Sequence, residues 1–301
     1  MFTFLSSYVH WSSVGQSSSR QVCDQQVLIR SGLERRVRAG HSGEHRPLKL
    51  QSRRRLLRLS LQRNSVESPP KDDVVLGGPF SGAFGEWFLT ETDVREVRAY
   101  RAGMALVSLA AVAATATAWV AAETPPSPVG PDQLPYGIIY EALYWTGVAG
   151  LGIALRYIHI YMRPLHRALQ YLLGIGAVTS AISDMVVWST SRDLYAHWVM
   201  THPVGVLTGA GWVAAALTGV FFKEAFCFRR AEASGLFVLV PLLMGGQLLD
   251  WWKGPQSDTG LMISVAIASL MALFSFRKMR QNVRDDLGDK SVFLYQQQRG
   301  L

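Results

Sequence analysis

Long apolar stretches alternate with short polar joints over the C-terminal two thirds of the chain. Each stretch comes close to the roughly 17–25 residues that an α-helix needs to cross a bilayer. The candidate spans are residues 103–122, 137–155, 168–188, 203–222, 235–252 and 260–276. Because a helix satisfies its own backbone hydrogen bonds in lipid, the pattern predicts an all-α fold, a polytopic membrane bundle of six transmembrane helices.

Basic residues gather at alternate joints between these spans. They are Arg95, Arg98 and Arg101 before the first span; Arg156, Arg163 and Arg167 after the second; Lys223, Arg229 and Arg230 after the fourth; and Arg277, Lys278, Arg280 and Arg284 after the sixth. The opposite joints hold only Arg192 and Lys253 as basic residues. Positively charged joints stay on the side of synthesis or import, so we expect both termini on that side.

The N-terminal region differs in composition from the rest of the chain. Residues 1–67 hold twelve of the 30 basic residues, four of the 22 acidic residues and several serine clusters, so the rest carries 18 residues of each sign. An Arg-rich, Ser-rich, acid-poor leader is typical of an organelle transit peptide, the alternative being a basic tail that stays on the protein. The neutral remainder gives no indication of nucleic-acid binding, although the whole chain has a net charge of +8.

The sequence predicts four regions. They are a transit peptide over 1–67, an N-terminal segment on the import side over 68–102, the transmembrane domain over 103–276 and a C-terminal tail over 277–301. Thr90 and Asp93 resemble a capping box, which predicts a helix start near residue 91. Gly77-Gly78-Pro79 predicts a linker, and we expect the tail to lose helical order after Gly288.

Small residues at a spacing of four predict close helix contacts within three of the spans. These residues are Ala110, Ala114 and Ala118 in the first span, Gly176 and Ser180 in the third, and the G-x-x-x-G pair Gly205 and Gly209 in the fourth. We expect these residues to serve packing within the bundle.

Three acidic side chains fall inside the predicted spans: Glu141, Asp184 and Asp250. At about 1.5 Å per helical residue they lie within one or two turns of the face opposite the basic joints, where His202 also lies in the sequence. Carboxylates and imidazole suit a divalent cation or a proton relay, so these four residues form a candidate polar intramembrane site whose metal is unknown. The alternative is that each acid pairs with a nearby base or is hydrated at the boundary.

A second candidate is the mixed segment KEAFCFRRAEA at residues 223–233. Its Lys223, Glu224, Cys227, Arg229 and Arg230 form a candidate juxtamembrane interaction site. Neighbouring cations can activate a thiol, whereas the alternative is an ordinary basic membrane anchor. The sequence contains no phosphate-binding loop, nucleophile elbow or zinc-protease signature, and it predicts no catalytic residue and no cofactor.

Two motifs and the spans together resemble a known family. FGEWFLTETD and VRAYRAG precede the first span, KEAFCFRRAEA follows the fourth, and six spans occupy the C-terminal 220 or so residues. This combination resembles the uncharacterised integral membrane family of cyanobacteria and plastids known as domain of unknown function 2301, over about residues 84–285. The resemblance implies a chloroplast destination and hence a chloroplast transit peptide, and it carries no established activity.

The expected protein is therefore a plastid membrane protein with both termini in the stroma, and the thylakoid is preferred over the inner envelope. The leading hypothesis is a non-catalytic interaction, assembly or structural component, whose partners are the lipid bilayer and photosynthetic membrane protein complexes, without nucleic acid. The alternative is a small ion or solute transporter that uses the intramembrane acids near the lumenal face. An enzyme is the third possibility, based on Cys227 or on the acids and histidine.

Overall fold

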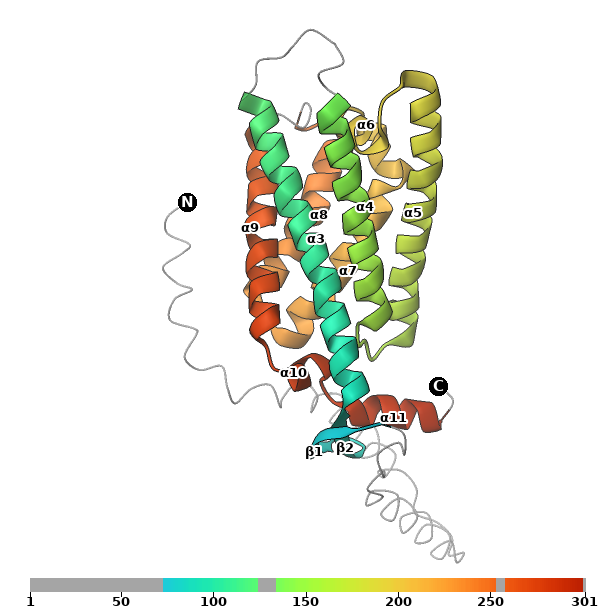
Figure 1. The fold of residues 1–301 in the computed structure, drawn as a ribbon, viewed down its shortest axis with the longest axis vertical. Coiled ribbons are helices and arrows are strands. Elements are labelled where there is room, and N and C mark those ends of the chain that lie inside the picture. The colour runs from blue at the N-terminus through green and yellow to red at the C-terminus, as the bar shows by residue number, and fades with distance from the viewer. Residues whose placement is uncertain (1–72, 124–133, 253–257, 300–301) are drawn as a thin grey trace, which may run out of the picture. The chain divides into compact units, whose positions relative to one another are not determined.

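The computed structural model describes residues 73–123, 134–252 and 258–299, so the predicted transit peptide lies outside the described residues. Its elements are β1 (Val75–Gly82), β2 (Gly85–Thr90), α3 (Glu91–Glu123), α4 (Leu134–Tyr157), α5 (Arg163–Ser191), α6 (Tyr195–Thr201), the 3-10 helix η3 (Pro203–Thr208), α7 (Ala210–Phe228), α8 (Ala231–Leu248), α9 (Asp258–Arg280), α10 (Val283–Leu287) and α11 (Lys290–Gln298) (Figure 1). Within the described ranges, six helices are long and apolar enough to cross a membrane, which confirms the polytopic all-α bundle.

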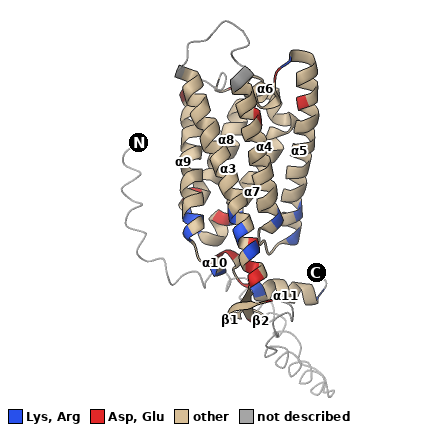
Figure 2. Cartoon of the chain, in the orientation of Figure 1, with Lys and Arg blue, Asp and Glu red and all other residues tan. Residues whose placement is uncertain are grey.

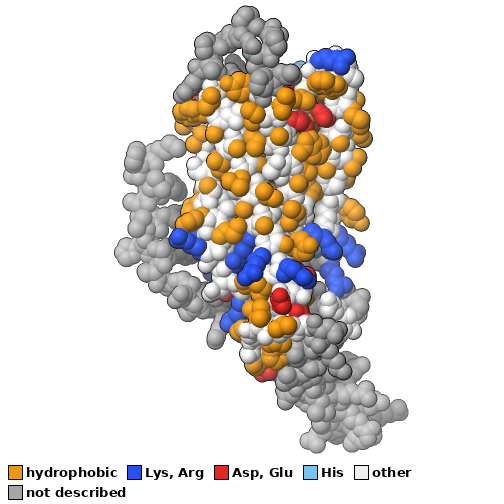
Figure 3. All heavy atoms as spheres, in the orientation of Figure 1, with side chains coloured by type: hydrophobic (Ala, Val, Ile, Leu, Met, Phe, Trp, Pro, Cys, Tyr) orange, Lys and Arg blue, Asp and Glu red, His pale blue; other side chains and the backbone are white. Residues whose placement is uncertain are grey.

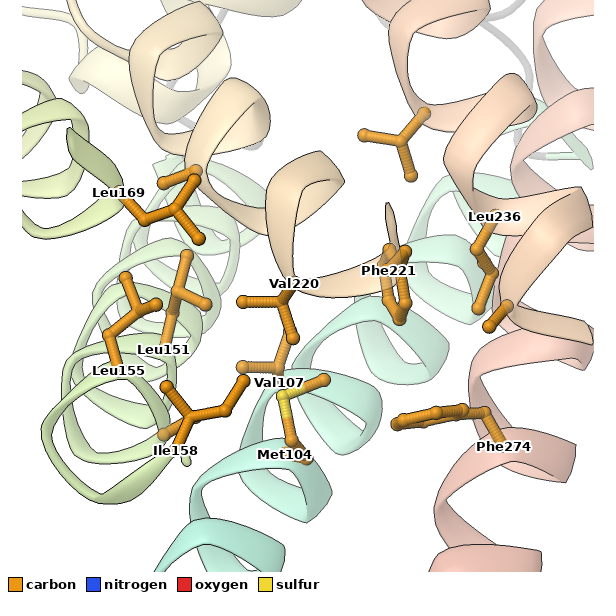
Figure 4. Packing of buried hydrophobic residues seen from close by; sticks show 14 of the residues in the cluster. Met104, Val107, Leu151, Leu155, Ile158, Leu169, Val220, Phe221, Leu236 and Phe274 are labelled. Carbon is orange, nitrogen blue, oxygen red and sulfur yellow. The ribbon is translucent and has the colours of Figure 1, made fainter. Parts of the chain in front are cut away.

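These six helices pack in the order in which they follow one another in the chain. The contacts run from α3 to α4, α5, α7, α8 and α9, and α9 returns to α3 (Figure 1). A continuous apolar core lies between them, and Met104, Leu155, Val220, Phe221 and Phe274 are among its buried members (Figure 4). The face of the bundle seen in Figure 3 carries many apolar side chains, and exposed large apolar residues such as Leu109, Val178 and Met262 occur on several of the helices, as expected where lipid rather than water is the solvent.

The helices are mostly longer than the predicted spans, and two of their boundaries change the position of predicted residues. The fourth helix begins at Ala210 rather than at residue 203, because Gly209 has φ 153° and interrupts the helix after the 3-10 turn. The fifth helix ends at Leu248, and Asp250 follows it in the left-handed region with φ 53°. Asp250 is therefore outside the helix in which the hydropathy pattern placed it.

Small residues make the closest contacts between helices, but the sequence predicted only some of these residues. A Cβ on Gly103 would lie 2.5 Å from the Gly150 carbonyl oxygen, so α3 and α4 touch through their backbones at a pair that the sequence did not reveal. Gly176 packs against Val213 of α7, which fits the predicted seam on the third span. The G-x-x-x-G pair does not lie on one helix as predicted, because Gly205 is in η3 and Gly209 is the α7 N-cap. Gly209 still packs closely within the bundle, since a Cβ there would lie 2.7 Å from the Ser180 backbone nitrogen.

The segments that flank the bundle fold together into a small cap, made of β1, β2, α10 and α11. The two strands form an antiparallel hairpin in which Phe80 is opposite Trp87. At its tip the Ala83 N–H donates to Asp289 Oδ2 at 2.7 Å, and the Phe84 N–H donates to Ser291 Oγ at 3.1 Å. The predicted linker at 77–79 and the predicted loosely ordered tail are therefore both wrong.

The cap is joined to the start of α3. Thr90 and Asp93 form the predicted capping box, with the Thr90 N–H donating to Asp93 Oδ2 at 2.9 Å, and α3 begins at Glu91 as expected. Lys290 of α11 donates to the same carboxylate at 2.6 Å. Trp87, Val97 and Leu287 form a separate small apolar cluster beneath the hairpin. The segments before α3 and after α9 thus each supply part of the cap, and a two-stranded hairpin alone would be only marginally stable.

Candidate functional site

The first predicted site lies around the short helix α6. Glu141 on α4 accepts a hydrogen bond at Oε2 from the Ala196 N–H at 2.8 Å, and Asp184 on α5 accepts one at Oδ1 from the Tyr195 N–H at 3.2 Å. These are backbone donors at the start of α6, which has no N-cap side-chain bond of its own. Two intramembrane acids therefore satisfy the unpaired N–H groups of a helix N-terminus, where negative charge is favourable.

Further contacts hold α6 inside the bundle. Tyr195 is completely buried, and its hydroxyl accepts a bond from the Ala210 N–H at 2.9 Å at the start of α7. Its ring packs edge-on against Tyr144, whose hydroxyl is 2.6 Å from Ser180 Oγ on α5. The Trp145 indole also donates to Glu141 Oε1 at 2.5 Å. The acids, tyrosines and tryptophan together fix α6 between α4, α5 and α7.

The other two members of this predicted site lie elsewhere. His202 is exposed and stacks on Trp198 with ring centroids 4.8 Å apart, and Asp250 is exposed beyond the end of α8. No hydrogen bond or ion pair joins either of these described residues to Glu141 or Asp184. Among the described residues, no group of three or more His, Cys, Asp or Glu side chains is placed to hold a metal ion. The structure thus brings together half of the predicted site.

The second predicted site lies at the basic end of the bundle, which we define as the start of α3, the α4–α5 and α7–α8 joints and the end of α9 (Figure 2). The structure divides its five residues. Lys223 and Glu224 are buried and Arg230 is partly buried, whereas Cys227 and Arg229 are exposed. The segment therefore does not act as one exposed surface.

Glu224 is the centre of a buried ionic cluster formed by Tyr100, Arg101, Lys223, Glu224, Lys278 and Asp286. The Glu224 side chain is 0% exposed. It accepts hydrogen bonds at Oε1 from the Tyr100 hydroxyl at 2.9 Å and from Lys223 Nζ at 3.0 Å. At Oε2 it accepts a bond from Lys278 Nζ at 2.5 Å. One carboxylate thereby links α3, α7 and α9.

Asp286 extends the cluster into the cap. The distance from its Oδ1 to Lys278 Nζ is 2.6 Å, and Arg101 Nε donates to its Oδ2 at 2.7 Å. The Arg101 and Asp286 side chains are 8% and 2% exposed, so this ion pair is also shielded from solvent. Because Asp286 belongs to α10, the cluster ties the cap to the bundle.

The buried cations also lie over aromatic rings. Lys278 Nζ is 4.6 Å from the Phe228 ring centroid and 5.2 Å from that of Tyr100, and Lys223 Nζ is 4.8 Å from that of Phe228. Such contacts become more favourable when the cation is desolvated. With three cations and two carboxylates in the cluster, the rings help to accommodate the extra positive charge.

A smaller ionic network lies beside it at the start of α8. Glu232 pairs with Arg277 at 2.9 Å and with Arg230 at 3.4 Å, and Arg230 also donates to Gln281 Oε1 at 2.5 Å. This network joins α8 to α9 and to the residues that lead into α10. Both networks serve mainly to hold helix ends together, and their carboxylates are occupied by groups of the same chain.

Sequence reasoning missed four members of the cluster: Tyr100, Arg101, Lys278 and Asp286. Three of them lie in basic stretches that were used to orient the spans, and Asp286 lies in the presumed tail. The acidic pair at 285–286, directly after a run of bases, was a signal that charges pair there. The sequence did not show which charges pair with which, because the partners lie far apart in the chain. Tyr100 and Glu224, for example, are 124 residues apart.

A family model supports the membrane architecture. The model described as "Uncharacterized integral membrane protein (DUF2301)" matches residues 153–295. The chain is similar to that family over this range. The matched range runs from within α4 into α11, so it includes Glu224, Lys278 and Asp286. It does not reach the FGEWFLTETD motif, which lies before the first span. No curated protein and no solved structure matches the chain. The chain is an integral multi-pass membrane protein.

Proposed function

We propose that this protein is an interaction or assembly component of the plastid membrane system, placed in the thylakoid rather than the inner envelope, with its basic end in the stroma. The location is supported by the Arg- and Ser-rich leader and by the family resemblance, and the orientation by the basic joints. Photosynthetic membrane protein complexes are the proposed partners.

The observation that carries the interaction role is an apolar surface on the cap hairpin. Val74, Val75, Leu76 and Phe84 are 60%, 39%, 55% and 45% exposed. Twelve residues of α3 separate the hairpin from the predicted first span at residue 103, a rise of about 18 Å. These side chains therefore lie away from the hydrocarbon, with Val74, Val75 and Leu76 at the open end of the hairpin and Phe84 in its turn. Exposed apolar groups in such a position favour an interaction surface.

The hairpin is held in place by contacts with the C-terminal helix. Phe84 stacks on Tyr295 of α11 with ring centroids 4.2 Å apart, and the two hydrogen bonds from the hairpin tip end on the first turn of the same helix. A surface that is rigid before binding loses less entropy when a partner docks. The hairpin is thus suited to bind a protein rather than to rearrange around a substrate.

Copurification tests this proposal. The full-length protein, tagged and expressed in its own plastid, is compared with the Leu76→Ser/Phe84→Ser variant on native gels in mild detergent. We expect the wild type to migrate with a larger complex and the double variant to migrate alone. Met279→Ser is the matched control, because Met279 is an exposed apolar residue at the same end of the bundle but outside the hairpin. A solitary wild-type monomer, or an unchanged complex in the double variant, contradicts the proposal.

The transporter alternative is tested by flux into liposomes with Glu141→Gln and Asp184→Asn. In the structure, Glu141 and Asp184 bind the backbone of α6. Flux that depends on either acid favours transport, and equal flux in the wild type and both variants rejects it.

A further inference from the structure

The basic end carries exposed cations in addition to the buried ionic cluster. Five arginines form what we call the arginine band: Arg95 and Arg98 on α3, Arg156 at the end of α4, and Arg163 and Arg167 at the start of α5. All five are exposed, and none forms an ion pair with another described residue. The three helices are neighbours, and basic side chains gather across their lower ends in Figure 3.

Acidic side chains near the band do not neutralise it. Glu96 of α3 is partly exposed and lies 3.3 Å from His159 in the α4–α5 joint. Glu91 is exposed at the first residue of α3. Two carboxylates against five guanidinium groups leave a local excess of positive charge, which attracts an anionic partner.

The surroundings of the band indicate that this partner is a lipid. Tyr157, Met162 and Tyr171 are exposed beside the arginines, a mixture of aromatic, apolar and cationic groups that suits the headgroup layer of a bilayer. The same outer faces continue into exposed Leu109 and Val178 nearer the middle of the spans. One molecule that touches both regions needs a hydrocarbon chain and an anionic head, which an acidic protein does not provide.

We propose that the arginine band binds the headgroups of anionic lipids in the leaflet at the basic end, with their acyl chains against α3, α4 and α5. A guanidinium group can donate two parallel hydrogen bonds to a phosphate or sulfonate, so the band recognises the head by geometry as well as by charge. The neighbouring His166 and Gln170 are used in a different way, because both bond to the Leu155 carbonyl oxygen near the end of α4. Because His166 and Gln170 are bonded within the protein, Arg163 and Arg167 are the polar groups at the start of α5 that bind the lipid headgroup.

The test measures which lipids the protein retains. The full-length protein is reconstituted in nanodiscs of phosphatidylcholine with or without phosphatidylglycerol, and retained lipid is counted by native mass spectrometry. We expect the wild type to retain phosphatidylglycerol selectively. Arg163→Gln/Arg167→Gln should weaken that retention by about fivefold for each charge removed, with a smaller effect at high salt.

Two further variants make the result specific. Arg192→Gln removes an exposed arginine at the opposite end of the bundle and should leave retention unchanged. Arg95→Gln/Arg98→Gln tests the α3 part of the band separately, and should weaken retention even if the α5 variant folds poorly. Equal retention of both lipids by the wild type, an equal loss in Arg192→Gln, or salt-sensitive capture of an acidic protein without lipid selectivity would overturn the proposal.

Discussion

Glu224 illustrates how a charge is tolerated inside this bundle. Its two oxygens accept three hydrogen bonds, from a tyrosine and two lysines, and none of its surface is exposed. Removing one partner of a buried pair costs far more than the intact pair contributes, because the other charge is left without compensation. The cluster should therefore respond strongly to single substitutions and less to paired ones.

Lys278→Met tests this at the residue scale. It leaves both Glu224 and Asp286 with one cation fewer, so we expect a loss of about 3 to 5 kcal/mol in the free energy of unfolding in detergent. Lys278→Met/Glu224→Gln should recover part of that loss. The control is Arg280→Met, an exposed cation two residues away whose contact with the Phe276 ring is worth about 1 kcal/mol or less. Equal losses in Lys278→Met and Arg280→Met would show that the buried cluster carries no special stability.

Gly103 and Gly174 make a matched pair of glycines in membrane helices. A Cβ at Gly103 would lie 2.5 Å from the Gly150 oxygen and 2.7 Å from the Ala154 nitrogen, whereas a Cβ at Gly174 meets nothing within 4 Å. Gly103→Ala should therefore destabilise the protein by about 1 to 3 kcal/mol through overpacking. Gly174→Ala should be neutral or slightly stabilising, by up to about 1 kcal/mol. Thermal unfolding of both variants in one detergent measures the difference, and a stable Gly103→Ala protein would contradict the close α3–α4 contact.

At the scale of elements, α6 depends on side chains from other helices. Glu141→Ala or Asp184→Ala removes one acceptor from its N-terminus and should cost about 1 kcal/mol, the usual value for a lost helix cap. The effect should be local, so hydrogen exchange of the backbone amides in Tyr195–Thr201 should speed up more than that of α7. Asp250→Ala is the control, because Asp250 is exposed outside α8. Unchanged exchange in both acid variants would mean that the caps are not needed.

Hydropathy predicted the long helices but could not separate a helix from a tight turn of similar composition. Residues 203–209 are as apolar as the helix that follows, yet Gly209 has a backbone conformation that no helix contains. The hairpin was missed for a different reason. Its Gly-Gly-Pro segment is typical of a linker, and its stability depends on Asp289 and Ser291, about 200 residues later in the chain. Local patterns do not contain that information.

At the scale of the whole molecule, the basic residues serve two separate purposes. Arg101, Lys223 and Lys278 are buried and fix the ends of the helices, while the arginine band faces outward. The sequence correctly indicated that cations gather at alternate joints, since that pattern depends only on their positions along the chain. It could not sort them into buried and exposed groups, because the partners of the buried ones lie on helices distant in sequence.

The central claim is that the chain crosses the membrane repeatedly with its basic joints on one side. Accessibility of single cysteines tests it most directly, in a background with Cys23 and Cys227 replaced by Ser. Arg163→Cys and Arg229→Cys report on two basic joints, and Ser191→Cys reports on the joint between them. We expect a membrane-impermeant thiol reagent added from the side of the basic joints to label the first two, and to label Ser191→Cys only after the membrane is opened. Labelling of Ser191→Cys together with the other two in sealed membranes, or labelling of only one basic joint, would contradict this account.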